Sequence, residues 1–282
     1  MLQLTLITDE ITQDFEHALQ VAQRFGIKNV EIRKVWHKNI ALFTDDDLQR
    51  MKTLLEQYNM GISVVSSPFA KCVLPGSKFV SRSPNFNRNP TYNLSFFDRL
   101  IEISNFLDCN LIRVFNFFKL GSKKIPDPCQ TAIDLMIPYV KKAESLGKTL
   151  LLENEHVCFA DNVANSLSYL DAVGSPGLKL NLDPGNFFSA KEQTIPAAYE
   201  VFYTKGLVGH MHVKDPGIRL PLLGGGFGVV GKGKIDYKSL FRQAIDHQYR
   251  GYISLETHAH RKRYNTSIQS LQFLTQTLSE LK

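Results

Sequence analysis

Eight short apolar segments alternate with eight helical ones along the sequence, and this alternation limits the fold more than any other feature. The apolar or alternating runs are typical of β-strands and cover residues 2–8, 29–33, 61–65, 111–115, 149–153, 178–182, 208–213 and 252–256. The segments with helical spacing cover residues 14–25, 45–58, 93–107, 130–146, 162–173, 195–205, 237–247 and 268–281. Glycines typical of helix ends follow several of them: Gly26, Gly61, Gly147 and Gly206.

Eight strand–helix units of about 35 residues each predict an α/β fold, the (β/α)8 TIM barrel. The alternative is a doubly wound open sheet, which usually has fewer strands and a glycine-rich turn after the first one. Here that turn reads TDEITQDF and contains no glycine. We therefore expect a single TIM-barrel domain covering residues 1–282.

Composition excludes several classes of protein. The chain has 43% hydrophobic and 21% charged residues, which is typical of a globular protein with a large core, and no apolar run is long enough to span a membrane. Its four cysteines lack CxxC spacing and its first residues do not resemble a signal peptide, so a cytoplasmic location is expected. The net charge of +6 is compatible with an anionic substrate or DNA, and equally with an ordinary solvated surface.

Polar residues occupy one face of each of the last four predicted strands. In LKLNLDPGN, which starts at residue 178, leucines alternate with polar side chains, so the two kinds lie on opposite faces. The same parity runs through TLLLENE, VGHMHVKDPG and GYISLETHAH. Because the apolar faces pack against helices, the polar faces should point into the barrel. Each ends near the top in one ionisable group: Glu153, Asp183, His212 and Glu256.

These three carboxylates and one imidazole form a candidate metal site. Buried carboxylates are costly unless they are paired or bind a cation. Any one of them alone is more commonly a helix cap or a solvated loop residue. At four successive strand ends, however, the oxygen-rich set suits one divalent ion such as Mn²⁺, Mg²⁺, Co²⁺ or Zn²⁺.

The two histidines of VGHMHVKDPG are not equivalent. Both face inward, but His210 lies two residues, or about 6.6 Å, deeper in the barrel than His212. We therefore expect His212 to be the metal ligand and His210 to support the site from below.

The ordered motifs resemble the xylose isomerase-like TIM-barrel superfamily. They are VEIR (30–33), LLLENE (150–155), LDPGNF (182–187), HMHVKD (210–215), GKGKID (231–236) and GYISLE (251–256). That superfamily includes sugar and sugar-phosphate isomerases and epimerases, inosose and dehydroshikimate dehydratases, and type IV apurinic endonucleases. The resemblance implies that the four strand-end residues bind the metal and that Glu153 and Glu256 exchange protons with the substrate from opposite sides.

One motif departs from the family pattern. Many members have Asp-x-x-His after the sixth strand, whereas this chain has Asp183-Pro-Gly-Asn186. An asparagine can still hydrogen-bond a substrate hydroxyl, but it cannot shuttle a proton near neutral pH. The endonuclease branch also needs several more histidines for its three zinc ions, so nucleic acid is not the expected partner.

Five residues are candidate substrate contacts: Glu31, Arg113, Asn186, Lys214 and Arg219. For Glu31 and Arg113 a buried ion pair is an equally good interpretation, with Glu31 pairing to its strand neighbour Arg33. Lys214 should lie just above the metal, or else be a solvated loop lysine. Arg219 resembles an arginine in the corresponding loop of some epimerases and isomerases.

The remaining candidates are weaker. The long connections 66–90 and 214–234 are equally consistent with lids and with loops that have no role. Trp36 and Phe187 could form an apolar wall against a sugar, although core packing is the first expectation for an aromatic side chain. Three histidines lie just beyond strand ends, and we expect at least two of them to be solvated, although any of them could support the site: His156, His258 and His260.

We therefore expect a divalent-metal-dependent isomerase or epimerase that acts on a small sugar, sugar phosphate or related polyhydroxy carbonyl compound through a metal-stabilised enediolate. A dehydratase with the same metal site is the nearest alternative. An apurinic-endonuclease-like DNA repair enzyme and a non-catalytic binding protein are further ones. No membrane partner is expected, and the sequence leaves the oligomeric state open, a homo-oligomer included.

Overall fold

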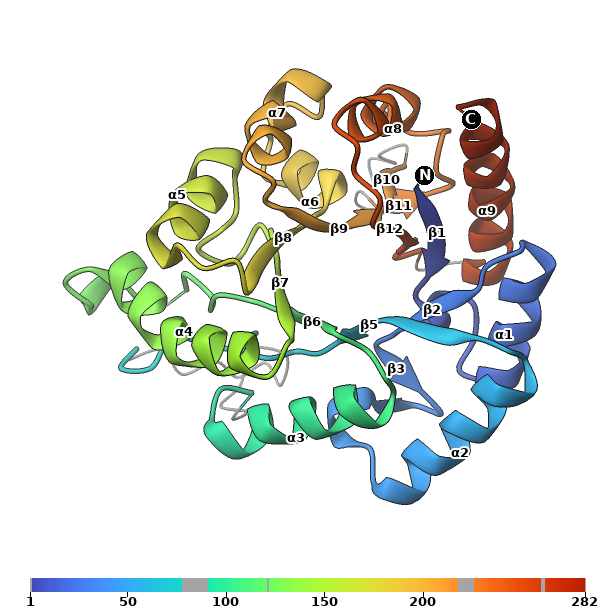
Figure 1. Ribbon diagram of the computed structural model, residues 1–282. Coiled ribbons are helices and arrows are strands. Elements are labelled where there is room, and N and C mark those ends of the chain that lie inside the picture. Colours follow the sequence, from blue (N-terminus) through green and yellow to red (C-terminus); the bar gives the residue numbers. More distant parts are fainter. Residues whose placement is uncertain (1, 78–90, 121, 218–225, 260–261, 282) are drawn as a thin grey trace.

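Eight parallel strands form a nearly closed barrel in the computed structural model, which describes residues 2–77, 91–120, 122–217, 226–259 and 262–281 (Figure 1). The sheet order is β1-β12-β9-β8-β7-β6-β5-β2, and a parallel bridge between Ile7 and Glu31 joins the two ends of the sheet. The strands are β1 (Gln3–Leu6), β2 (Asn29–Ile32), β5 (Gly61–Ser66), β6 (Leu111–Val114), β7 (Thr149–Glu153), β8 (Leu178–Leu182), β9 (Val208–Val213) and β12 (Tyr252–Leu255).

A ring of helices surrounds the barrel (Figure 1). They are α1 (Phe15–Arg24), α2 (Asp45–Gln57), α3 (Leu94–Phe106), α4 (Pro128–Ser145), α5 (Val163–Val173), α7 (Pro196–Thr204), α8 (Tyr237–Asp246) and α9 (Arg263–Glu280). The predicted α/β TIM barrel is therefore confirmed. None of the helices described is both long and apolar enough to cross a membrane.

Helix α9 begins at Arg263, five residues before the predicted start at residue 268. Its buried face contains serines, which hide the apolar periodicity. Ser267 donates to the backbone carbonyl of Glu10 at 2.9 Å, and Ser270 accepts from the backbone N–H of Val230 at 3.0 Å. Because both hydroxyls are hydrogen-bonded, these serines can be buried at positions where a helix would usually carry apolar residues.

The carboxyl ends of the strands carry short elements that hydrophobic periodicity did not predict. They are the helix α6 (Pro184–Ser189) and two antiparallel ribbons, β3 (Lys34–Val35) with β4 (Lys38–Asn39) and β10 (Asp215–Pro216) with β11 (Phe227–Gly228). Each has too few residues to show a period. All of them follow barrel strands, so they build up the end of the barrel where TIM-barrel enzymes place their active sites.

The glycine-rich segment after β11 folds around one carboxylate. Asp215 accepts the backbone N–H groups of four residues at 2.9–3.2 Å: Gly231, Gly233, Lys234 and Ile235. A Cβ at Gly233 would lie 2.0 Å from Asp215 Oδ1, so only glycine fits there. This close approach explains why the GKGK segment contains glycine, and no bound nucleotide is needed to explain it.

The expected parity of the polar strands is present. Leu178, Leu180 and Leu182 are buried in the hydrophobic core, and the alternating Asn181 belongs to the polar interior of the barrel, where it contacts His212. The polar ends of β7, β8, β9 and β12 are adjacent in the sheet order, so their last inward-facing side chains converge at one edge of the barrel.

Candidate metal centre

Four buried side chains meet at the carboxyl ends of β7, β8, β9 and β12. Glu153 ends β7, Asp183 caps the N-terminus of α6, His212 lies near the end of β9, and Glu256 follows β12. Each is at most 2% exposed, and one donor atom from each lies within 4.8 Å of the others. These are the four ligands that the sequence predicted, and together they could hold one metal ion.

The orientation of His212 presents a specific ring nitrogen to the carboxylates. Its Nε2 lies 2.9 Å from Oε1 of Glu31, and an ionised carboxylate only accepts, so Nε2 carries the proton. Its Nδ1 is 3.4 Å from Glu256 Oε2, 3.8 Å from Glu153 Oε2 and 4.0 Å from Asp183 Oδ2. A carboxylate that fixes the far nitrogen of an imidazole is the usual support of a metal-binding histidine.

Burial lowers the pKa of the His212 imidazole, but Glu31 and Glu256 outweigh this effect and raise the pKa well above its ordinary range. A metal ion that binds Nδ1 must therefore displace a proton. The affinity for the metal is then expected to depend on pH.

Below His212 lies a fully buried hydrogen-bonded group, the floor of the site, made of Glu31, His210 and Ser66. His210 Nε2 is 2.9 Å from Glu31 Oε2, and Ser66 Oγ donates to the same carboxylate. Burial raises the pKa of Glu31, but the two imidazoles hold it well below its usual value. His210 is thus deeper than His212, as expected, and Glu31 contacts the histidines rather than facing the mouth of the barrel.

Glu153 is held by one cation and one amide. Arg113 Nη1 donates to Oε2 at 3.0 Å, and Asn186 Nδ2 donates to Oε1 at 3.0 Å. The same guanidinium also donates to the backbone carbonyls of Ser66 and Ser67 at 3.3–3.4 Å. Arg113 and Asn186, two candidate substrate contacts, are therefore engaged with the glutamate itself.

Glu256 is surrounded by positive charge. Arg33 Nη1 lies 2.7 Å from Oε1, and Lys214 Nζ lies 2.7 Å from Oε2. His258 Nε2 is 3.1 Å from Oε1, so this histidine contacts the site although its side chain is 41% exposed. Burial raises the pKa of Glu256, but His258, Lys214 and His212 together hold it well below its usual value.

Arg33 connects Glu256 to a second pair of carboxylates. Its Nη2 is 2.9 Å from Asp9 and 2.6 Å from Glu10, which also accepts from Thr257 Oγ1 at 2.9 Å. Sequence reasoning missed Asp9 and Glu10. The available signal was their position directly after the first predicted strand, at the same edge of the barrel.

Asp183 is the least completely bonded of the four. Its Oδ1 accepts the backbone N–H of Asn186 at 3.0 Å, whereas Oδ2 has an ion pair with Lys214 at 2.6 Å but no hydrogen bond within the described chain. Burial raises the pKa of Asp183 to about 6, with Lys214 opposing the rise and Glu256 and Glu153 adding to it. A divalent cation at Oδ2 would relieve this cost further than the single charge of Lys214 does.

The charges around the site fit a divalent cation. Six carboxylates belong to the connected network: Asp9, Glu10, Glu31, Glu153, Asp183 and Glu256. Within the described part of the chain, three permanent cations lie within 3.0 Å of them, Arg33, Arg113 and Lys214, and Arg263 lies 3.8 Å from Glu10. The raised pKa of His212 adds one more positive charge, which leaves one carboxylate without a compensating charge. The excess of buried negative charge and the unbonded oxygen of Asp183 suit a metal ion bound by the four residues.

Two aromatic rings line the mouth above these residues. The Phe115 ring centroid is 4.2 Å from Lys71 Nζ and 4.8 Å from the Arg113 guanidinium carbon. The Phe227 ring lies 5.4 Å from Lys214 Nζ and 6.1 Å from the His258 ring. The mouth thus combines cations with apolar faces.

A further ion pair contributes to the mouth. Glu155 binds Lys71 at 2.9 Å and His156 at 2.8 Å, so His156 is paired even though its side chain is 47% exposed. Arg219 and His260 lie outside the described residues, as do residues 78–90 and 218–225 of the two long connections.

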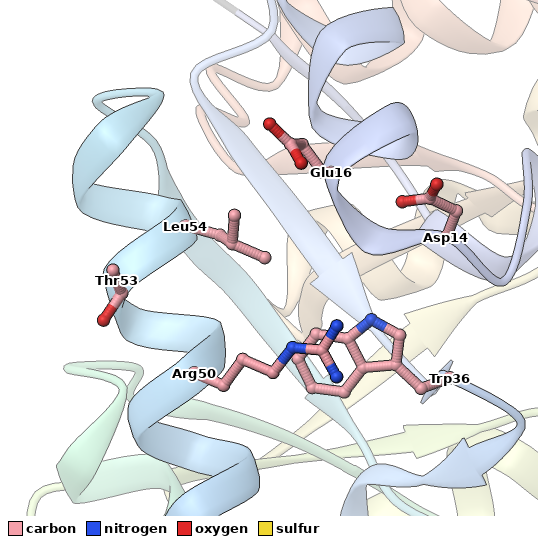
Figure 2. A pocket seen from close by; sticks show the side chains of 6 residues that line it. All are labelled: Asp14, Glu16, Trp36, Arg50, Thr53 and Leu54. Carbon is pink, nitrogen blue, oxygen red and sulfur yellow. The ribbon is translucent and has the colours of Figure 1, made fainter.

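The two aromatic residues considered as a sugar-binding wall pack elsewhere. Trp36 lines a groove of about 620 Å³ between α1 and α2, where the Arg50 guanidinium carbon lies 4.1 Å from the indole centroid (Figure 2). Phe187 is buried and stacks on Tyr199 and Phe202. Both therefore follow the alternative expectation of packing against protein groups.

Solved structures of several sugar enzymes resemble this one. D-allulose 3-epimerase from Methylomonas sp., in complex with D-allulose, has a TM-score of 0.73 at 17% identity, over 98% of this chain and 97% of that one. The probable 3-DHS dehydratase AsbF of petrobactin synthesis from Bacillus anthracis has a TM-score of 0.72 at 17% identity, over 97% and 99%. A xylose isomerase-like TIM barrel protein from Mycobacterium smegmatis, in complex with magnesium, has a TM-score of 0.72 at 14% identity, over 99% of this chain and 97% of that one.

These identities establish a common fold only, and no curated protein sequence is significantly similar to this one. The family model described as xylose isomerase-like TIM barrel, however, matches residues 19–277, which contain all four candidate ligands. The chain belongs to the xylose isomerase-like TIM-barrel family.

Proposed function

We propose that this protein is a divalent-metal-dependent isomerase or epimerase of a small sugar, sugar phosphate or related polyhydroxy carbonyl compound. One observation carries the proposal: three carboxylates and Nδ1 of His212 converge within 4.8 Å while Glu31 fixes the other ring nitrogen. Mn²⁺, Mg²⁺, Co²⁺ or Zn²⁺ would suit this set. The similarity to sugar epimerase structures supports the choice of substrate class.

When bound, the divalent ion would polarise a substrate carbonyl and acidify the neighbouring C–H group. Glu153 and Glu256 stand at the two ends of the four-strand run, separated by β8 and β9. One glutamate would take the proton from the substrate and the other would return it, which inverts a centre or moves the carbonyl. Arg113 and Asn186 hold Glu153 in place, and Arg33 holds Glu256.

Two cations at the same edge would stabilise the negative charge that develops as the proton leaves. Lys214 is buried beside Glu256, and Arg113 is buried beside Glu153. Positive groups in a dry site stabilise such charge strongly. Of the predicted substrate contacts, Lys214 is therefore the one we retain as facing the substrate.

A dehydratase that uses the same residues is the second candidate. It is favoured by the resemblance to the probable 3-DHS dehydratase. Such an enzyme would remove the same proton and then expel a β-hydroxyl group.

Heavy water separates the two activities. The protein is loaded with Mn²⁺ and incubated in D₂O with a panel of ketoses, aldoses and their phosphates. Solvent deuterium on carbon in a recovered isomer supports the proposal, whereas a product that has lost water supports the dehydratase. Turnover by a Glu153→Ala variant that is verifiably free of metal contradicts both.

A further inference from the structure

The ammonium group of Lys214 lies among the four candidate metal ligands. Its Nζ is 2.6 Å from Asp183 Oδ2 and 2.7 Å from Glu256 Oε2. These are the oxygens that face Nδ1 of His212, at 4.0 and 3.4 Å. Lys214 therefore bridges two of the donor atoms that a metal ion would use.

The position of Lys214 is built into the surrounding structure. The Tyr237 hydroxyl accepts from the backbone N–H of Lys214 at 3.1 Å and donates to its carbonyl at 2.7 Å. A Cβ at Gly185 would lie 2.5 Å from Lys214 Cγ, so the glycine makes room for the lysine stem. The side chain is only 1% exposed. The backbone clamp and the tight fit direct the ammonium into the ligand set.

A divalent ion and this ammonium cannot bind the same oxygens together. Carboxylate oxygens bind such ions at about 2.0–2.2 Å, which leaves no room for a nitrogen that bridges the same two atoms. The two positive charges also repel each other strongly in a buried site. The ammonium must therefore withdraw as the metal enters, and the Phe227 ring, whose centroid is 5.4 Å from Nζ, offers it a cation–π contact outside the ligand set.

We propose that Lys214 is a built-in competitor of the metal ion. It neutralises Asp183 and Glu256 until a divalent cation displaces it, and it sets the metal affinity below the value that the four ligands alone would give. The inference rests on the proposed function, because it takes these four residues as metal ligands. Lys214 thus tunes metal affinity in addition to facing the substrate.

The test compares Mn²⁺ affinity in the wild type and in Lys214→Met, which keeps the length of the stem without the charge. The electron paramagnetic resonance signal of free Mn²⁺ reports binding in the absence of any substrate. We expect the variant to bind Mn²⁺ at least tenfold more tightly. Lys71→Met removes another lysine of the mouth, one that pairs with Glu155, and should stay within twofold of the wild type.

A second measurement needs no variant. Reductive methylation with labelled formaldehyde, followed by mass spectrometry, reports how accessible and reactive each lysine is. Saturating Mg²⁺ should raise the labelling rate of Lys214 at least threefold in the wild type and leave that of Lys71 unchanged. An unchanged or slower rate at Lys214 contradicts displacement.

The outcomes distinguish this inference from the function on which it rests. If Lys214→Met and the wild type bind Mn²⁺ equally well, or the variant binds it more weakly, the competitor role is wrong and the metal site stands. If neither protein binds Mn²⁺, the metal-dependent function fails, and the competitor role fails with it.

Discussion

The two halves of the barrel contribute differently to the candidate metal centre. The half formed by β7, β8, β9 and β12 supplies the candidate ligands, one from each strand end. The half formed by β1, β2, β5 and β6 supplies groups that hold those ligands. They are Glu31 of β2 and Arg33 just after it, Ser66 of β5, Arg113 of β6, and Asp9 and Glu10 just after β1.

This difference shows how one fold separates chemistry from its support. A ligand needs only the last inward position of its own strand. A supporting group needs the closed barrel, because Glu31 reaches His212 and Arg33 reaches Glu256 from strands that are distant in sequence. Substitutions in the ligand half should therefore abolish binding and turnover, whereas those in the support half should weaken them or destabilise the fold.

The largest effect is expected in the ligand half. Glu153→Gln removes a metal ligand and an acid–base group but keeps the shape of the side chain. We expect turnover to fall by about 10⁴-fold, the upper end of the range for one acid–base residue, because two roles are lost together. Steady-state kinetics on the substrate found in D₂O measures the change, and a loss below tenfold would show that Glu153 has neither role.

Arg33→Met tests the support half through stability. The substitution leaves Asp9, Glu10 and Glu256 buried without their common cation and should lower the free energy of unfolding at pH 7 by about 3–5 kcal/mol. Burial raises the pKa of Glu10, but Arg33 helps hold it below its usual value, so this stabilisation exists above about pH 4.5 and is lost in acid.

Urea denaturation of Arg33→Met and the wild type at pH 7 and pH 4 checks both statements. The difference in the free energy of unfolding between the two proteins should be smaller at pH 4, where the unpaired carboxylates of the variant can take up protons. A gap that is absent at pH 7, or that widens in acid, would contradict the role given to Arg33.

Glu31→Gln sharpens the comparison within the floor of the site. The amide no longer attracts the proton of His212 Nε2 with a full charge, so Nδ1 is presented less well. We expect Mn²⁺ affinity to fall 10- to 100-fold, as is typical for groups that orient a metal ligand. Ser254→Ala is the matched control. Ser254 is also a buried polar residue of a barrel strand, but its hydroxyl has no hydrogen-bond partner within the described chain. Equal affinities in the two variants would contradict the account.

The smallest effect is a dependence on pH that belongs to the ligand half alone. Because the pKa of His212 is raised, metal binding releases its Nδ1 proton, and affinity should rise with pH. Below about pH 6 Asp183 also has to lose a proton, so the metal affinity should rise more steeply with pH there than above it. Mn²⁺ titrations between pH 5 and 8 measure this slope, and a flat profile is incompatible with these two ligands.

Much of the ligand half could be predicted from the sequence, and little of the support half. Strand parity is a local property, so the alternation in LKLNLD or GHMHVK identifies which side chains point inward. Barrel closure is not local. The bridge between Ile7 and Glu31 brings β2 beside β1, and only then do Asp9, Glu10 and Arg33 meet.

Two side chains near the site point where the strand pattern could not predict. Asn186 was considered a substrate contact, but the short helix α6 turns its amide onto Glu153. The sequence could not tell which of the three histidines beyond strand ends supports the site. His258 contacts Glu256 from a backbone with a positive φ of 46°, which strand patterns do not predict. In both cases a short segment after a strand, a helix for Asn186 and a loop for His258, decides where the side chain points.

The most direct test of the central claim is a crystal structure of the Mn²⁺-loaded protein with anomalous diffraction. The account predicts one ion per chain, about 2.0–2.3 Å from Nδ1 of His212 and from oxygens of Glu153, Asp183 and Glu256. An ion bound through Nε2 of His212, no ion at these residues, or a centre of three zinc ions would contradict it.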